Sequence, residues 1–147
     1  MTATAHALVG GAIAAAIPNP AIAIPLALAS HPVLDMIPHW DFGRRWRNKS
    51  RALFLAEGIF DLTVGLVSSY IIFGAHVNLI YLLSVIFASL IFDLLMVPYW
   101  FFKWHFPPFS WAYKIQSQIN AKAKLPWGIF TQAITVMGVI LVLRGIN

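Results

Sequence analysis

The chain has 147 residues, of which 60% are hydrophobic and only 10% are charged, with a formal net charge of +5. Soluble domains usually carry about a quarter charged residues, so this composition and the mean hydropathy of +0.77 predict an integral membrane protein. The length predicts a single domain, residues 1–147. The chain contains no cysteine, which excludes disulfides and thiolate chemistry.

Five apolar segments follow one another along the chain, and they predict an all-α fold. Segments 5–17 and 21–37 are short for a span, which needs about 20 residues, so we expect them to form a tight hairpin. Segments 52–75, 78–102 and 127–143 are long enough to cross a bilayer as helices. The residues before the first segment include no Lys or Arg, so it lacks the basic region of a signal peptide and we expect it to be retained.

The stretch "PPFSWAYKIQSQINAKAKLP" lies between the last two apolar segments and has a more polar residue pattern than they have. Its apolar residues alternate roughly with Lys and Gln, which predicts an amphipathic helix on the cytoplasmic membrane surface. Trp104 and Trp111 would anchor this helix at the interface. A solvated connector is the alternative interpretation.

The basic residues predict the orientation of the chain. Nine of the ten lie in two loops, namely Arg44, Arg45, Arg47, Lys49 and Arg51 in the first, and Lys103, Lys114, Lys122 and Lys124 in the second. If segments 52–75 and 78–102 form a hairpin, loops 44–51 and 103–124 fall on one side, and the positive-inside rule makes that side cytoplasmic. Nucleic acid is not an expected partner, because these residues lie in loops pressed to a membrane and no binding motif accompanies them.

The few acidic residues concentrate at one depth of the predicted membrane. They are Asp35, Asp41, Glu57, Asp61 and Asp93. At 1.5 Å rise per residue, Glu57 and Asp61 lie roughly 8 and 14 Å from the start of their segment, and Asp93 lies roughly 14 Å from the end of the next. Topology brings His6, His31 and His39 to the same cytoplasmic half. Since a charge inside hydrocarbon costs at least a few kcal/mol, we expect these groups to be paired or to surround an ion.

His31 and Asp35 form the strongest pair. They are four residues apart, so on a helix they share one face. Pro32 and Pro38 complicate the local structure, because proline suits the first turn of a helix and breaks its interior. The helix is therefore expected either to restart at Pro32 or to end near Pro38.

Imidazoles and carboxylates without thiols suit zinc, manganese or iron, so we expect one or two divalent ions, most simply zinc or manganese. The candidate ligands are His6, His31, Asp35, His39, Asp41 and Asp93. Several have an alternative. His6 could be an ordinary interfacial residue, and Asp35 could cap its helix and bond a nearby histidine. Asp41 could pair with Arg44 or Arg45, and Asp93 could accept a hydrogen bond from a histidine or be a protonated structural aspartate. Glu57 and Asp61, also four residues apart, are the candidate catalytic carboxylates that help to deprotonate a metal-activated water.

The motifs "HALVGG", "SHPVLDMIPHWD" and "EGIFDL" resemble those of the small multi-pass, membrane-bound, metal-dependent hydrolases of bacteria and archaea. The matching positions are His6, Gly10, His31, Asp35, Pro38, His39, Asp41, Glu57 and Asp61, all within residues 1–65. The chain departs from the pattern after the first hairpin, where many members carry a His-Arg-Gly-x-Thr-His-Ser element and "RRWRNKSRALFLAEG" has no histidine. The resemblance implies a protein of the prokaryotic cytoplasmic (inner) membrane.

These observations together predict a metal-dependent membrane hydrolase. It would cleave a phosphoester or similar bond of a lipid or lipid-linked substrate at the cytoplasmic leaflet, through metal-activated water. A small ion, proton or metal transporter that uses the same intramembrane acids is an alternative, as is a non-catalytic membrane scaffold with a structural metal. Membrane lipids are expected partners. Gly10, Gly11 and Ala14 could pack helices closely, either within one chain or between the chains of a homo-oligomer.

Overall fold

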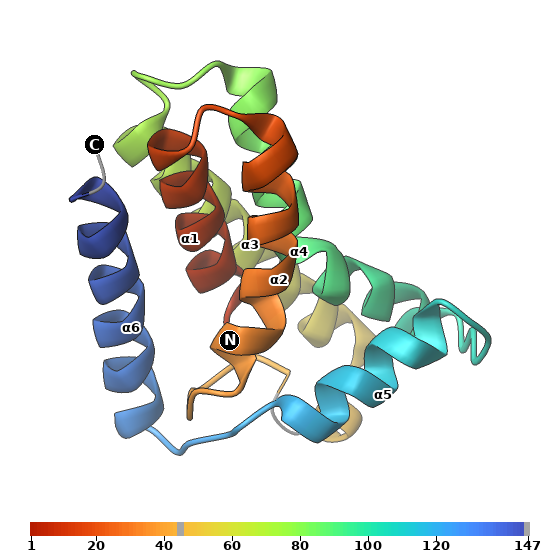
Figure 1. Ribbon diagram of the computed structural model, residues 1–147. Coiled ribbons are helices and arrows are strands. Elements are labelled where there is room, and N and C mark those ends of the chain that lie inside the picture. Colours follow the sequence, from red (N-terminus) through yellow and green to blue (C-terminus); the bar gives the residue numbers. More distant parts are fainter. Residues whose placement is uncertain (44–45, 146–147) are drawn as a thin grey trace.

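The computed structural model describes residues 1–43 and 46–145, and within them the protein is all-helical (Figure 1). The elements are α1 (Ala3–Ala16), α2 (Pro20–Asp35), a 3-10 helix η1 (Trp46–Asn48), α3 (Arg51–Phe73), α4 (Leu79–Phe101), α5 (Phe109–Ile119) and α6 (Trp127–Arg144). Helices α3, α4 and α6 are long and apolar enough to cross a membrane, whereas α1 and α2 are shorter. The predicted helical class and the short first hairpin are therefore confirmed.

Side-chain caps determine where the first four of these α-helices begin. Thr2, Asn19, Ser50 and Asn78 each accept a hydrogen bond from a backbone N–H of the first turn that follows. Such caps satisfy donors that have no partner inside the helix. The predicted segment boundaries consequently lie within a few residues of the observed ones.

Helix α2 runs through both of its internal prolines, Pro25 and Pro32, and ends at Asp35. Of the two expectations for this helix, an end near Pro38 is confirmed and a restart at Pro32 is wrong. Neighbouring helices can supply partners for the backbone groups that a proline leaves free in a membrane helix. His31 and Asp35 therefore lie on consecutive turns of one continuous helix.

Helix α1 forms the centre of the bundle and packs against α2, α3, α4 and α6. Its glycines permit this close approach. A Cβ added at Gly10 would lie 2.6 Å from Ser89 Oγ and 3.0 Å from Ile86 Cα in α4, and one added at Gly11 would lie 2.7 Å from the Phe73 ring in α3. These small residues thus serve contacts within the chain.

The loops that follow α2 and α5 lie at the same end of the bundle, opposite the α3–α4 turn (Figure 1). They are joined directly, since the His39 N–H donates to the Ala121 carbonyl at 3.0 Å and the Ala123 N–H donates to the His39 carbonyl at 2.8 Å. The two basic loops therefore share one side, as predicted, and Arg44 and Arg45 of the first loop lie outside the described residues. That this side is cytoplasmic stays a prediction.

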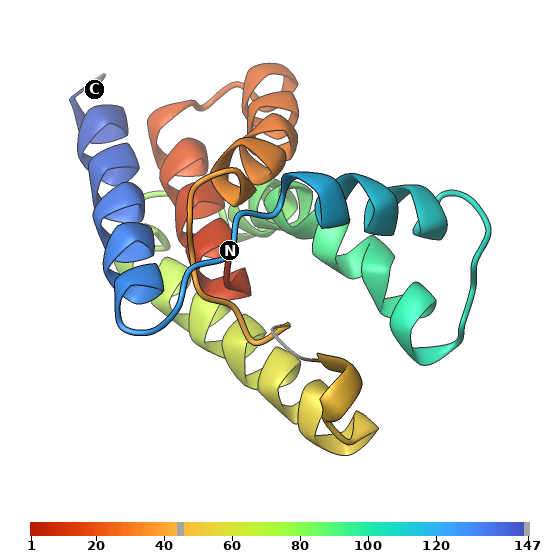
Figure 2. The same ribbon diagram turned by 90° about the horizontal axis from the view of Figure 1, so that it is seen from below.

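The outer faces of α3 and α6 are apolar and exposed, which is the pattern of helices that contact lipid. Examples are Ile59, Phe60, Ile71, Ile134, Leu141 and Val142. Helix α5 lies alongside α4 (Figure 2) and is amphipathic as predicted, with Ala112 and Gln116 buried and Trp111 exposed. Its contact with a membrane surface stays a prediction.

Candidate metal centre

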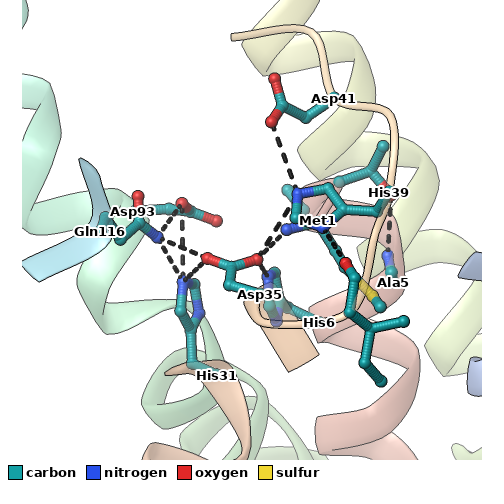
Figure 3. A network of polar contacts seen from close by, with 12 residues as sticks. Met1, Ala5, His6, His31, Asp35, His39, Asp41, Asp93 and Gln116 are labelled. Carbon is teal, nitrogen blue, oxygen red and sulfur yellow. Dashed lines mark hydrogen bonds and ion pairs between the residues drawn. The ribbon is translucent and has the colours of Figure 1, made fainter. Parts of the chain in front are cut away.

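All six predicted metal ligands meet in one buried network at the polar end of the bundle (Figure 3). Helix α1 contributes His6, helix α2 contributes His31 and Asp35, the loop after α2 contributes His39 and Asp41, and helix α4 contributes Asp93. The first four of these are fully buried and Asp41 is 8% exposed. Burial of so many polar groups is costly unless each finds a partner, so these groups must pair with one another or surround an ion.

Asp35 is the hub of this network. Its Oδ1 lies 3.2 Å from His6 Nε2 and 3.8 Å from His39 Nε2, and it also contacts the ammonium group of Met1. Its Oδ2 lies 3.4 Å from His31 Nε2. One carboxylate therefore links three imidazoles that come from three separate segments.

Backbone carbonyls orient two of these imidazoles. His31 Nδ1 lies 2.6 Å from the Ser89 carbonyl oxygen, and His39 Nδ1 lies 2.7 Å from that of Ile37. Because a carbonyl only accepts hydrogen bonds, each Nδ1 carries the hydrogen and donates it. In the neutral form, each Nε2 then directs its lone pair at the carboxylates, which is the arrangement of metal-ligating histidines.

His6, His31 and Asp93 offer ligand atoms that all lie within 4.8 Å of one another, so this group could hold a metal ion. The two imidazole rings are stacked, with centroids 3.8 Å apart and planes 9° from parallel. Buried atoms without a hydrogen-bond partner among the described residues add to the fit, since they include His6 Nδ1, His39 Nε2 and Asp41 Oδ1. A mixed set of imidazoles and carboxylates suits divalent transition metals.

The network also includes Gln116 of α5, which the sequence analysis did not identify. Its Nε2 lies 2.6 Å from His31 Nε2, 3.0 Å from Asp35 Oδ2 and 3.2 Å from Asp93 Oδ1. The available signal was a polar residue on the apolar face of an amphipathic helix, four residues after the buried Ala112.

Asp41 lies in the loop after α2, between His39 Nε2 at 3.5 Å and Lys122 Nζ at 3.8 Å. Burial alone would raise the pKa of Asp41, but the neighbouring His39 imidazole and the charge of Lys122 outweigh burial and hold that pKa below its ordinary value. Asp41 is therefore ionised at neutral pH. Its predicted alternative partners, Arg44 and Arg45, lie outside the described residues.

The two predicted catalytic carboxylates have other partners. Asp61 accepts hydrogen bonds from the Ala3 N–H at 2.7 Å, the Thr4 N–H at 3.1 Å and the Thr4 hydroxyl at 2.7 Å. It thus fixes the start of α1, where a helix favours negative charge. Glu57 forms an ion pair with Lys49 at 2.5 Å. A catalytic role for Glu57 and Asp61 stays a prediction, and their observed contacts are structural.

A cavity of about 630 Å³ lies beside the network, where α3 and α4 splay apart (Figure 2). Its polar part includes Asp41, Asp61, Asp93 and Gln116, with Arg47 and Lys122 as basic groups. Its apolar part includes Phe42, Trp46, Phe54, Trp100 and Phe101. The cavity therefore combines an aromatic wall with a wall of polar and charged side chains, to which Asp93 of the candidate metal group belongs.

Searches of protein-family models, curated proteins and solved structures found no match to this chain. The resemblance to membrane-bound hydrolases therefore stays a prediction based on its motifs.

Proposed function

We propose that the protein is a metal-dependent membrane hydrolase that cleaves a phosphoester or similar bond of a lipid or lipid-linked substrate. The observation that carries this proposal is the amphipathic cavity beside the buried histidine–aspartate network. Asp93 belongs to both, because it is part of the candidate metal group and it also lines the cavity. Its side chain is 29% exposed, so it is the ligand most accessible to a molecule in the cavity.

The cavity walls support a substrate with an apolar chain and an anionic group. The aromatic residues offer the chain a large apolar surface, while Arg47 and Lys122 offer charge-assisted hydrogen bonds to phosphate. Arg47 is held in place because its guanidinium lies 5.2 Å from the centre of the Trp46 ring and donates a hydrogen bond to the Tyr113 hydroxyl at 3.2 Å. A lipid would enter laterally between α3 and α4, and the distribution of basic residues favours the cytoplasmic leaflet.

The residues of the network would have different roles. His6, His31 and Asp93 would hold the ion, while Asp35 and the Ser89 carbonyl orient the imidazoles. Zinc and manganese both suit this donor set. When bound, such an ion supplies a Lewis acid that polarises a phosphoryl oxygen and lowers the pKa of water.

Asp41, His39 and the aromatic wall would assist the reaction beside the ion. Asp41 lines the cavity and its buried Oδ1 has no hydrogen-bond partner among the described residues, so Asp41 is the candidate proton acceptor beside the ion. His39 and Asp41 also offer nitrogen and oxygen donors for a second ion. The aromatic wall limits the access of bulk water, which strengthens electrostatic interactions inside the cavity.

The proposal is tested by phosphate release from detergent-purified protein supplied with Mn²⁺ or Zn²⁺. The substrates are phosphatidic acid in mixed micelles and a water-soluble phosphate monoester. We expect turnover of the lipid, and we expect Asp93→Asn to abolish it. If folded, metal-loaded protein releases no product from phosphatidic acid or from a panel of phosphodiester lipids, the proposal is contradicted, and metal or proton flux in liposomes would then favour the transporter.

A matched pair of variants tests the role of the cavity. A Cβ at Gly58 or at Gly138 meets nothing within 4 Å, but only Gly58 lines the cavity. Gly58→Phe should therefore reduce lipid turnover while metal binding persists, and Gly138→Phe should leave both unchanged. Equal turnover in the two variants would argue against the cavity as the lipid site.

A further inference from the structure

The amide group of Gln116 lies among three hydrogen-bond acceptors (Figure 3). They are His31 Nε2, Asp35 Oδ2 and Asp93 Oδ1, at 2.6, 3.0 and 3.2 Å from Gln116 Nε2. In the neutral imidazole, His31 Nε2 is an acceptor because the other ring nitrogen donates to the Ser89 carbonyl. Gln116 is itself only 4% exposed and His31 and Asp35 are fully buried, so water gives little help in satisfying the acceptors of His31 and Asp35.

An amide nitrogen cannot satisfy this arrangement by itself. It carries two hydrogens, while three acceptors converge on it and two of them belong to carboxylates. Buried acceptors without a hydrogen are costly. A cation among the acceptors removes this deficit, because it interacts favourably with all of them at once.

The amide can also present its oxygen at the same place. The terminal torsion of glutamine is broad and nearly two-fold, and the two ends of an amide are distinguished only through their hydrogen-bond partners. Facing three acceptors alone, the amide oxygen would be repelled. With a cation among them, the amide oxygen becomes one more ligand.

We infer that Gln116 is a ligand of the metal through Oε1 and joins His6, His31 and Asp93 around the ion. This inference rests on the proposed metal centre. Amide carbonyl oxygens bind hard cations, and carbonyl and carboxylate ligands suit manganese better than thiolates or imidazoles do. The fourth ligand therefore shifts the expected preference of the site from zinc towards manganese.

The same bond would fix α5 to the metal centre. Gln116 is the one α5 side chain of this network among the described residues, while Tyr113 and Ser117 of the same helix line the cavity. Trp111, on the opposite face, is 60% exposed. Binding of the ion is thus coupled to the ordering of one cavity wall, and by linkage a molecule that orders α5 strengthens binding of the ion.

The competing interpretation is that Gln116 only donates hydrogen bonds to the carboxylates. The two interpretations predict opposite effects of removing the amide. If Gln116 is a ligand, the affinity for the ion falls. If it is only a donor, its removal frees the carboxylates, and the affinity stays equal or rises.

The test is the Kd for Mn²⁺ of the detergent-solubilised full chain, measured by calorimetry. We compare wild type with Gln116→Met, which keeps the shape of the side chain but lacks the amide, and with Gln116→Glu, which keeps an oxygen ligand. Loss of the ligand should raise the Kd at least about tenfold in Gln116→Met, and Gln116→Glu should bind more tightly than Gln116→Met. Gln118→Met on the exposed face of α5 is the matched control and should match wild type.

Hydrogen–deuterium exchange of α5 provides a second readout, and its decisive comparison uses the wild-type protein alone. Mn²⁺ should slow exchange across Phe109–Ile119 in wild type and in Gln118→Met, but not in Gln116→Met. Unchanged or faster exchange in wild type on Mn²⁺ binding would overturn the inference, even if a Gln116 variant failed to fold.

The outcomes separate the inference from the proposed function. Mn²⁺ binding by wild type with an equal or lower Kd in Gln116→Met overturns only the role of Gln116. Absence of Mn²⁺ and Zn²⁺ binding by folded wild type overturns the metal centre and, with it, both proposals.

Discussion

The contact between α1 and α4 supports the metal centre directly, and Gly10→Ala tests this. An added Cβ would lie 2.6 Å from Ser89 Oγ and 3.0 Å from Ile86 Cα, both well inside van der Waals contact. Ser89 cannot withdraw freely. Its hydroxyl donates to the His6 carbonyl at 2.9 Å, and its own carbonyl accepts the His31 Nδ1–H at 2.6 Å. Relief of the clash must therefore move a group that orients a ligand.

The magnitude follows from these contacts. Overpacking of a close contact costs about 1–3 kcal/mol, and a weakened hydrogen bond to His31 costs roughly another 1 kcal/mol. The better helix propensity of alanine offsets up to about 1 kcal/mol. We therefore expect Gly10→Ala to lower the free energy of unfolding by about 1–3 kcal/mol and to weaken metal binding as well.

The assay is unfolding in detergent, followed by far-ultraviolet circular dichroism, together with the Mn²⁺ Kd. Gly58→Ala is the matched control, since its Cβ meets nothing within 4 Å, and it should be neutral or slightly stabilising. A Gly10→Ala protein that is as stable as Gly58→Ala and binds Mn²⁺ as tightly as wild type would refute the reasoning.

Two further predictions concern Asp61 and the bound ion. Asp61→Ala removes three hydrogen bonds from the start of α1 and should lower the free energy of unfolding by about 3 kcal/mol. Glu57→Ala breaks a partly exposed ion pair and should cost about 1 kcal/mol or less; equal losses would contradict the structural role of Asp61. Chelation of the metal should lower the free energy of unfolding by about 2.7 kcal/mol from a state with free ion at roughly 100 times its Kd. His31→Gln should show no such loss on chelation, and a loss as large as that of wild type would place the ion elsewhere.

Much of the helical framework could be predicted from the sequence, because length and hydropathy are local properties. Segment 127–143 corresponds to Trp127–Arg144, and 52–75 corresponds to Arg51–Phe73. The sequence left open whether α2 restarts at Pro32 or continues towards Pro38, because packing against neighbouring helices, which the sequence does not show, outweighs the local preference of proline.

The histidine–aspartate network could also be predicted from the sequence. Topology alone places its members at one depth of the membrane. Because burying an unpaired charge is costly, these groups are expected to contact one another. The contacts of Asp61 and Gln116 could not be predicted, because they depend on how helices that are distant in the sequence pack together. Asp61 contacts Thr4 across 57 residues, and Gln116 contacts His31 across 85. Neither contact leaves a periodic pattern in the sequence.

The proposals above depend on a divalent metal in the buried network. The direct test is elemental analysis of detergent-purified protein, after incubation with Mn²⁺ or Zn²⁺ and removal of free ion. His31→Gln is the test variant, and His76→Gln, an exposed histidine beyond the far end of α3, is its control. We expect at least one ion per chain in wild type and in His76→Gln, and a loss in folded His31→Gln. Folded wild type without metal, or with metal that His31→Gln retains in full, would contradict this expectation.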